Sequence, residues 1–318
     1  MRTPVVALLA TGALLLASCS DSSVDVASSE TLGSTIATSD TGSTDSGADT
    51  TTAVTDPGAE TTTGAPIDFD FTIEWTGELE PGVEQGYLEV PRDYSDPTAG
   101  TFRLYLVRHL ADTADRIGSL LVNPGGPGFG GSILAMVADQ VYGDDLIRSF
   151  DIIGWDPRGT GLSEPAVDCF DDYDHFYAGT DITPDDPAER QQLVDLAQEL
   201  ADSCVERSGD VLPYIGTNNS ARDMDAIRQA LGEDTISYFG FSYGSELGAV
   251  WATLFPDTVR AAVLDGAADP DATLDEGGIQ QSEGFEKSIN TFLAQCSDNA
   301  DCPFHSGGDA EGAFDELM

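Results

Sequence analysis

Basic residues are scarce in this chain of 318 residues, since 13 are Lys or Arg, 57 are acidic, and Lys287 is the only lysine. The resulting formal net charge of −44 would repel phosphate groups, so we expect no nucleic-acid partner. A cationic substrate, such as a peptide with a free amino end, would be attracted. Solubility or a saline habitat is the favoured explanation for most of the charge.

The apolar run at the N-terminus is too short to span a bilayer comfortably. It covers residues 5–16, follows Arg2, and ends in Leu-Ala-Ser-Cys at 16–19, which is typical of an export signal. That ending resembles a bacterial lipobox, in which the cysteine, here Cys19, is lipidated and becomes the new N-terminus. We therefore predict a signal over residues 1–19 and anchoring to the outer face of a bacterial cell membrane. The alternative is an ordinary signal peptide with a chance cysteine.

Residues 20–66 contain no aromatic residue, lysine or arginine. Such a segment buries too little apolar surface to offset its ordering entropy, so we predict a flexible tether. Folded sequence is expected from residue 67, with an α/β core over 67–270 and the start of a helical cap over 271–318.

The sequence lacks the residue spacings of a zinc site, because it has three histidines and neither a C-x-x-C nor an H-x-x-x-H pattern. We expect no metal and no other cofactor. Besides Cys19, an even number of cysteines remains, which in an exported domain suggests disulfides. They lie in two separate clusters, which favours pairing Cys169 with Cys204 and Cys296 with Cys302.

Short apolar segments alternate with helical patterns, and each segment runs into a loop, glycine-containing in every case. The segments cover residues 119–123, 150–155, 235–239 and 261–264. This alternation is typical of a mostly parallel, doubly wound sheet, in which ligands bind outside the carboxyl ends of the strands. Two earlier strands are expected at 86–90 and 101–110, separated by a polar turn through Asp96 to Gly100. His109 is expected on the surface of an edge strand.

Two helices are marked by their ends. Asp186 as N-cap and Glu189 as its capping-box partner begin one helix, whose apolar stripe places Cys204 on a buried face. Ser220 and Gly232 bracket the second.

Residues 240–244 read Gly-Phe-Ser-Tyr-Gly and directly follow the apolar segment 235–239. A strand, a G-x-S-x-G turn and a helix start form the layout of a nucleophile elbow, which presents the serine oxygen above the sheet edge. We therefore predict that Ser242 is a catalytic nucleophile.

A serine hydroxyl is a weak nucleophile and needs donors that hold the developing oxyanion. In an elbow the backbone N–H after the serine, here that of Tyr243, supplies one donor. The second is expected from the glycine-rich loop at 125–128, with Gly126 as the candidate and Gly125 as the fallback.

The serine also needs a base, and hydrolases of this chain order place an acid and then a histidine after the nucleophile. His305 is the only histidine beyond Ser242, and its use as the base would require an unusual fold-back from the cap region. The acidic neighbours of His175 should favour its charged form, which suits a base poorly. Asp265, at the end of a strand, is an alternative candidate for the acid, although a structural role is favoured.

Four motifs in order make the chain recognisable. They are Asn-Pro-Gly-Gly-Pro-Gly at 123–128, Asp-Pro-Arg-Gly-Thr-Gly-Leu-Ser at 156–163, the elbow at 240–244, and Leu-Asp-Gly-Ala-Ala-Asp-Pro at 264–270. Together they closely resemble the exported tripeptidyl-aminopeptidase-like branch of the α/β-hydrolases, a serine peptidase family related to prolyl aminopeptidase.

The resemblance covers about residues 70–318 and implies an α/β-hydrolase fold, with Ser242 as nucleophile and Gly126 and Tyr243 in the oxyanion hole. It implies a structural role for the loop at 156–159, and the four cysteines match the family's two disulfides. The family's acid and histidine lie in a segment after the cap to which nothing here aligns. We therefore expect the last strands, the acid and the histidine to be missing from this chain.

The expected function is that of an exported serine hydrolase, an aminopeptidase releasing short peptides from free N-termini through an acyl-enzyme on Ser242. The expected partners are a peptide or small acyl substrate and the membrane. Two alternatives remain open: a non-catalytic peptide-binding lipoprotein that kept the elbow, and an esterase or amidase using the same serine.

Overall fold

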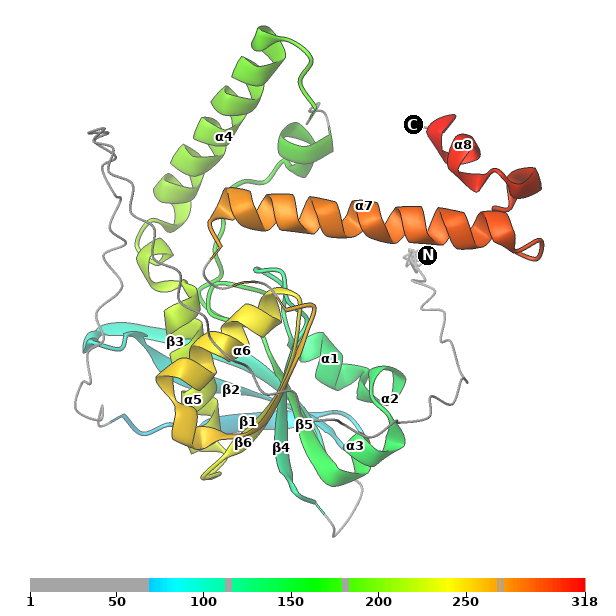
Figure 1. Ribbon diagram of the computed structural model, residues 1–318. Helices are drawn as coiled ribbons and strands as arrows, with labels where there is room; N and C mark the ends of the chain where they lie inside the picture. Colours follow the sequence, from blue (N-terminus) through cyan, green and yellow to red (C-terminus); the bar gives the residue numbers. More distant parts are fainter. Residues whose placement is uncertain (1–68, 112–115, 179–182, 268, 270–271, 318) are drawn as a thin grey trace, which may run out of the picture. The chain divides into compact units, whose positions relative to one another are not determined.

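A seven-stranded sheet with helices on both faces carries the fold in the computed structural model (Figure 1). The structure describes residues 69–317 apart from 112–115, 179–182, 268 and 270–271. All of the described elements belong to one unit of the chain, Thr62–Met318. The predicted signal, its Cys19 and the predicted tether lie outside the described residues.

Strands and helices alternate from β4 onwards, as the sequence pattern predicted. The strands are β1 Ile73–Glu80, β2 Val83–Asp93, β3 Asp96–His109, β4 Gly118–Asn123, β5 Phe150–Trp155, β6 Ile236–Phe241 and β7 Val259–Asp265. The α-helices are α1 Ser132–Met136, α2 Ala138–Val141, α3 Asp144–Ser149, α4 Pro187–Ser208, α5 Thr217–Ala230, α6 Tyr243–Leu254, α7 Leu274–Asp298 and α8 Ala310–Asp315. Short turns of other helix types are η1 Asp174–Ala178, η2 Leu212–Tyr214, η3 Pro256–Thr258 and η4 Ser306–Gly308.

Most strands of the sheet point in one direction. The strand order is β1-β2-β3-β5-β4-β6-β7. β4 pairs in parallel with β5 and β6, and β7 pairs in parallel with β6. β3 runs antiparallel to both β5 and β2, and β1 runs antiparallel to β2. The predicted α/β class with a mostly parallel, doubly wound sheet is therefore confirmed.

Alternate residues of the central strands enter two different hydrophobic cores. On β3, Phe102, Leu104 and Leu106 pack on the side of α5 and α6. Tyr105 and Val107 pack on the opposite side, with α1, α2 and α3. Each of these five side chains is at most 2% exposed, and full burial of one large apolar side chain contributes about 1.5–3 kcal/mol. Successive side chains of a strand point to opposite faces, so these two cores show that the sheet is covered on both faces.

The parallel register brings the ends of three strands to one edge of the sheet. Leu121 of β4 pairs with Ile153 of β5 and with Tyr238 of β6. The loops that leave β4, β5 and β6 at their carboxyl ends are the glycine-rich loops of the sequence. They gather where ligands bind in sheets of this kind.

The two early strands are longer than predicted, and their turn is shorter. β3 already begins at Asp96, so the predicted turn through Gly100 is wrong. Asp93 instead closes a tight turn by accepting hydrogen bonds from the backbone and side chain of Ser95, at 2.7 and 2.6 Å. The edge position predicted for His109 is also wrong, because β3 lies between β2 and β5 and His109 pairs with Ile152. Its ring is half-buried.

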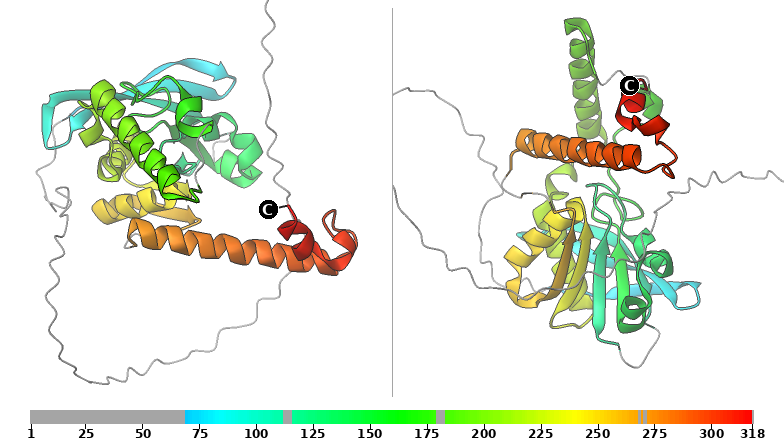
Figure 2. Two further views of the ribbon diagram at one scale, coloured as in Figure 1. Left: turned by 90° about the horizontal axis from the view of Figure 1, so that it is seen from above. Right: turned by 45° about the vertical axis from the view of Figure 1, so that its right-hand side comes forward.

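α4 begins as predicted. The Asp186 carboxylate accepts from the backbone N–H groups of Ala188 and Glu189, and the Glu189 carboxylate accepts from the backbone of Asp186. The predicted disulfide between Cys169 and Cys204 is present. Cys204 is half-buried rather than buried, because α4 extends away from the sheet and few described residues cover its apolar stripe (Figure 2).

α5 begins three residues before the predicted cap at Ser220. Gly216 occupies the N-cap with extended backbone angles and no side-chain cap. Ser220 is inside the helix and buried, with 4% of its surface exposed. The helix start is therefore at a glycine, and the serine that the sequence offered as its cap lies one turn inside the helix.

The C-terminal part of the chain is helical, as expected for residues 271–318, although its role as a cap stays a prediction. α7 and α8 enclose a small core of Leu293, Cys296 and Ala310. The predicted disulfide between Cys296 and Cys302 is present beside it. None of the helices in the described part of the chain is both long and apolar enough to cross a membrane.

Candidate active site

Ser242 lies between β6 and α6 in a backbone conformation that L-residues rarely adopt. Its φ is 53° and its ψ is −124°, and the residue is exposed. Non-glycine residues in such conformations cost about 1–3 kcal/mol and cluster at functional sites. The predicted nucleophile elbow is thus present in its geometry.

The two glycines of the G-x-S-x-G sequence are required by close contacts. A Cβ at Gly240 would collide with the carbonyl of Gly244. A Cβ at Gly244 would lie 2.9 Å from the Asn123 side-chain oxygen and 3.0 Å from the Asn123 carbonyl. The elbow therefore packs directly against the end of β4.

Three hydrogen bonds hold the elbow. The Ser242 N–H donates to the Asp265 carbonyl at 2.8 Å, and the Ser245 N–H donates to the Ser242 carbonyl at 2.8 Å. The Tyr238 hydroxyl donates to the Gly244 carbonyl at 2.7 Å. Burial raises the pKa of Tyr238 well above its ordinary value, so this hydroxyl remains a donor at any physiological pH.

The glycine-rich loop after β4 lies against the nucleophile. Gly125 has a φ of +98°, and a Cβ there would be 2.5 Å from the Phe241 carbonyl and 2.9 Å from the Ser242 Cβ. The Gly125 N–H donates to the Asn123 side chain at 2.8 Å. Among the described residues the Gly126 N–H has no acceptor, which favours Gly126 over Gly125 as the second oxyanion donor. The pairing of Gly126 with the Tyr243 N–H stays a prediction.

Asp156 ties the loop after β5 to the start of α1, which follows the glycine-rich loop. Its two carboxylate oxygens accept from the backbone N–H groups of Ser132, at 3.1 Å, and Leu162, at 2.8 Å. Glycines at 130 and 161 leave room for this carboxylate, since a Cβ at either position would collide with it. Asp156 is 2% exposed, so its role is structural.

Arg158 is buried beneath the same loop and is fully partnered. Its Nε donates to Asp223 at 2.7 Å, a second nitrogen bonds the same carboxylate, and further donors reach the carbonyls of Pro91, Arg92 and Tyr214. Burial acts to lower the pKa of Arg158, but the charge and hydrogen bonds of Asp223 outweigh it and raise the pKa. The structural role expected for the loop at 156–159 is thereby confirmed.

A pocket of about 530 Å³ opens beside the elbow. It is lined by Asn123, Gly125, Pro127, Gly128, Phe129, Pro157, Arg158, Gly159, Thr160, Gly161, Ala166, Val167, Tyr173, Ile215, Ser220, Tyr243 and Leu247. The Tyr243 hydroxyl shares a hydrogen bond of 2.7 Å with Thr217, and burial raises the pKa of Tyr243. Because Gly125 and Tyr243 both flank Ser242, a ligand in this pocket would lie next to the nucleophile.

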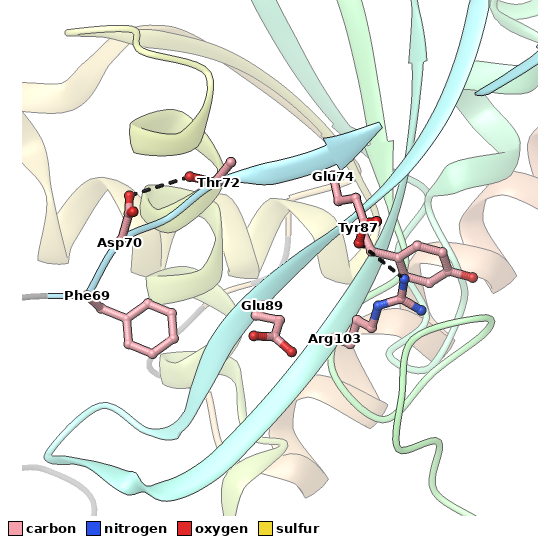
Figure 3. Close-up of a pocket in the computed structure, with 7 residues that line it drawn as sticks. All are labelled: Phe69, Asp70, Thr72, Glu74, Tyr87, Glu89 and Arg103. Atoms are coloured by element: carbon pink, nitrogen blue, oxygen red, sulfur yellow. Dashed lines mark hydrogen bonds and ion pairs between the residues drawn. The ribbon is translucent and has the colours of Figure 1, made fainter. Parts of the chain in front are cut away.

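A second pocket, of about 410 Å³, lies on the antiparallel end of the sheet (Figure 3). Arg103 stacks on Tyr87, at 3.5 Å from the ring centroid, and pairs with Glu74 at 3.7 Å. The residues that line this second pocket include no cysteine, histidine or strained serine. Several of them lie on β1 and β2, at the opposite end of the sheet from β6. The pocket beside Ser242 is therefore the candidate active site.

Comparison with protein families decides the identity of the fold. Residues 118–306 match the family model described as the alpha/beta hydrolase fold. The chain belongs to the α/β-hydrolase family.

Curated relatives of this α/β-hydrolase include peptidases and an esterase. It is 38% identical over 241 residues to "Serine protease Hip1" of Mycobacterium tuberculosis, a match covering 73% of this chain and 46% of the relative. It is 38% identical over 251 residues to "Tripeptidyl aminopeptidase" of Streptomyces coelicolor, covering 76% and 46%. It is 39% identical over 219 residues to "Carboxylesterase B" of Mycobacterium tuberculosis, covering 68% and 42%. The chain spans about half the length of these relatives, and the resemblance to tripeptidyl aminopeptidases is confirmed.

No histidine of the described residues contacts Ser242 in this α/β-hydrolase. His175 of η1 lies 3.1 Å from Glu199 of α4, and His305 lies in the turn before η4. The carboxylate of Asp265 is exposed, and only its backbone contacts the elbow. Among the described residues, no group of three or more His, Cys, Asp or Glu is placed to hold a metal ion.

Two residues of the α/β-hydrolase site were missed in the sequence. Asp223, the partner of Arg158, lies four residues before the buried Ile227 of α5, so an acidic residue at helical spacing from the core was the available signal. Tyr173 lines the pocket from a segment outside the four motifs, and no local pattern indicates that placement.

We expect Gly125→Ala to lower the turnover of an acyl substrate about 100-fold or more. The new Cβ would push against Ser242 and displace the loop that carries the predicted second oxyanion donor, and loss of one such donor costs about 10²–10³ in rate. Steady-state kinetics on a chromogenic acyl substrate would measure it.

Gly128→Ala is the matched comparison. Gly128 has nearly the same φ, +99°, but a Cβ there meets nothing within 4 Å. Both variants share the cost of a positive φ, so their difference isolates the collision. Equal losses in the two variants would contradict the contact assigned to Gly125.

Proposed function

We propose that this protein is a serine hydrolase that forms an acyl-enzyme on Ser242 and acts as an aminopeptidase on short peptides. The observation that carries the proposal is the strained, exposed Ser242 of the elbow, which lies against Gly125 and directly before the first N–H of α6. Neither core packing nor a surface turn calls for a strained serine between two tightly packed glycines.

The proposed reaction proceeds in two steps. The Ser242 oxygen attacks the scissile carbonyl carbon, the C–N bond breaks, and the amine leaves with a proton. Water then attacks the Ser242 ester and releases the peptide acid. Backbone N–H groups of Tyr243 and Gly126 would stabilise the oxyanion in both steps. In this proposal the base and its acid come from polypeptide outside the described residues.

Two lines of support favour a peptide substrate with a free amino end. The relatives include proteins named serine protease and tripeptidyl aminopeptidase. The chain's net charge of −44 would also attract a cationic α-amino group. The substrate length and the choice of residue at the cleaved bond are not part of the proposal.

We also propose that the protein is exported and held at a membrane by a lipid on Cys19. The support is the Leu-Ala-Ser-Cys sequence at 16–19 and the two disulfides, which are typical of oxidising compartments. A mass increase on the N-terminal peptide that starts at Cys19, in protein from its native membrane fraction, would test this. Cleavage elsewhere without lipid would contradict it.

One observation favours an esterase as the second candidate, namely the 39% identity to a protein named carboxylesterase B. The same elbow and oxyanion donors serve esters and amides alike, so geometry does not separate the two. A peptide-binding protein without turnover is the third reading, since no described histidine contacts Ser242.

The test combines a covalent probe with matched substrates. A fluorophosphonate should label the protein, and the adduct should map by mass spectrometry to the peptide containing Ser242. A tripeptidyl arylamide should be cleaved with higher kcat/KM than a short-chain nitrophenyl ester. The reverse order would favour the esterase, and absence of both labelling and turnover would overturn the hydrolase proposal.

A further inference from the structure

Two large aromatic side chains line the candidate active-site pocket while remaining mostly exposed. Phe129 is 67% exposed and Tyr173 is 69% exposed. Phe129 belongs to the glycine-rich loop after β4, and Tyr173 immediately precedes η1. Exposed aromatics that share one concave site are typical of ligand-binding surfaces rather than of a satisfied core.

Tyr173 is held in place by its neighbours. Its ring lies 4.8 Å from that of Phe170 in an edge-on arrangement and 6.1 Å from that of Tyr177 in a stacked arrangement. The disulfide of Cys169 fastens the start of this segment to α4. A wall that is already positioned loses little conformational entropy when a ligand binds.

Ion pairs and hydrogen bonds fasten the same segment a second time. Arg207 of α4 pairs with Asp168 at 3.1 Å and with Asp171 at 2.6 Å. The Ser208 hydroxyl both accepts from the Asp168 N–H and donates to its carbonyl, each at 2.9 Å. Tyr173 is thus exposed because of where it is held, and not because its segment lacks contacts.

The pocket floor is apolar and close to the nucleophile. Ala166, Val167, Ile215 and Leu247 line it, and its volume of about 530 Å³ falls in the range of about 300–1,000 Å³ of small-ligand sites. The residue that carries the attacked carbonyl must place that carbonyl beside Tyr243, which lines the same pocket. The side chain of that substrate residue is therefore expected to contact the apolar floor of the pocket.

We propose that Phe129 and Tyr173 form an aromatic-walled subsite that selects an aromatic or large aliphatic side chain at the acyl residue of the substrate. This inference rests on the proposed function for the location of the reacting carbonyl. Binding, in contrast to turnover, requires no base, so the subsite is testable without catalysis.

The test measures binding of two tripeptides, Ala-Ala-Phe and Ala-Ala-Gly, to the full chain by titration calorimetry. We expect Ala-Ala-Phe to bind at least tenfold more tightly, because burial of one phenyl group is worth that much or more. Tyr173→Ala should reduce the ratio of the two dissociation constants to near one, and Tyr173→Phe should keep it. Phe129→Ala should reduce it in the same direction.

Phe285→Ala is the matched control, because Phe285 is 68% exposed on α7 and does not line the pocket. It should leave the ratio unchanged. Equal binding of the two peptides, no binding of either, or a ratio that survives Tyr173→Ala would each overturn the subsite. Selective binding by a protein that shows neither fluorophosphonate labelling of Ser242 nor turnover would support the subsite and remove the proposed hydrolase.

Discussion

In protein that includes the polypeptide supplying the base, Ser242→Ala is expected to lower kcat for a tripeptidyl arylamide by about 10⁵–10⁶-fold, to the level left by binding and the oxyanion donors alone. In serine hydrolases loss of the nucleophile costs about as much as loss of the whole catalytic set. The variant keeps the pocket and the backbone donors, so KM should change little. Steady-state kinetics with fluorophosphonate labelling of the same samples would measure both.

Stability gives this prediction a second readout that a purely structural serine would not produce. Ser242 adopts a φ of 53° at a cost of about 1–3 kcal/mol, and glycine adopts such angles with little cost. Ser242→Gly should therefore be inactive and more stable than the wild type by about 1 kcal/mol in urea unfolding. An inactive but stabilised variant indicates that strain is retained for chemistry.

Ser282→Ala is the control, since Ser282 is exposed on α7 and donates only to the Gly278 carbonyl of its own helix. It should leave turnover and unfolding unchanged. Full turnover in Ser242→Ala would mean that another residue is the nucleophile. A destabilised Ser242→Gly would mean that the serine side chain contributes to the fold.

Local patterns in the sequence predicted the elements that border the site. The strand at 150–155 was placed at its observed bounds, and the elbow was placed on Ser242, because a buried strand followed by G-x-S-x-G leaves few alternatives. The two disulfides also followed from sequence, since each pair lies within a separate cluster of cysteines.

What failed depends on contacts between distant segments. The environment of His109 is set by β5, whose pairing with β3 begins 43 residues later in the chain, at Ile152. The partner of Arg158 is Asp223, 65 residues away, and neither residue has a local pattern that names the other. Tyr173 lines the pocket from the segment between β5 and α4, which the disulfide of Cys169 joins to α4. Such placements follow from tertiary packing, which the helix and strand propensities of a sequence and its hydrophobic periodicity do not predict.

The pair of Arg158 and Asp223 leads to the prediction with the largest expected effect on stability. Both side chains are 0% exposed, and the Tyr94 hydroxyl donates to the same carboxylate at 2.8 Å. Asp223→Asn would leave the guanidinium buried without its counter-charge. Removing one partner of a buried pair typically costs about 3–5 kcal/mol. Urea unfolding followed by tryptophan fluorescence and circular dichroism would measure the loss.

Asp210→Asn is the matched control. Asp210 pairs with Arg92 at 3.4 Å but is 72% exposed, and exposed pairs contribute about 0–1 kcal/mol. Its stability should therefore stay close to that of the wild type.

A double-mutant cycle separates the pair from its surroundings. Arg158→Met combined with Asp223→Leu removes both charges, so the double variant should be less destabilised than the sum of the two single variants. The contacting pair should show a coupling energy of about 0.5–3 kcal/mol. Part of the cost should remain, because Arg158 also donates to the carbonyls of Arg92 and Tyr214.

The same pair links stability to the site. Arg158 fastens the pocket-lining loop at 157–161 to α5 through Asp223 and to the end of β2 through the Arg92 carbonyl. Asp223→Asn should therefore weaken binding of Ala-Ala-Phe at a urea concentration where the fold is still intact. Additive effects in the cycle, or unchanged peptide binding in a destabilised Asp223→Asn, would show that the pair supports the core without shaping the pocket.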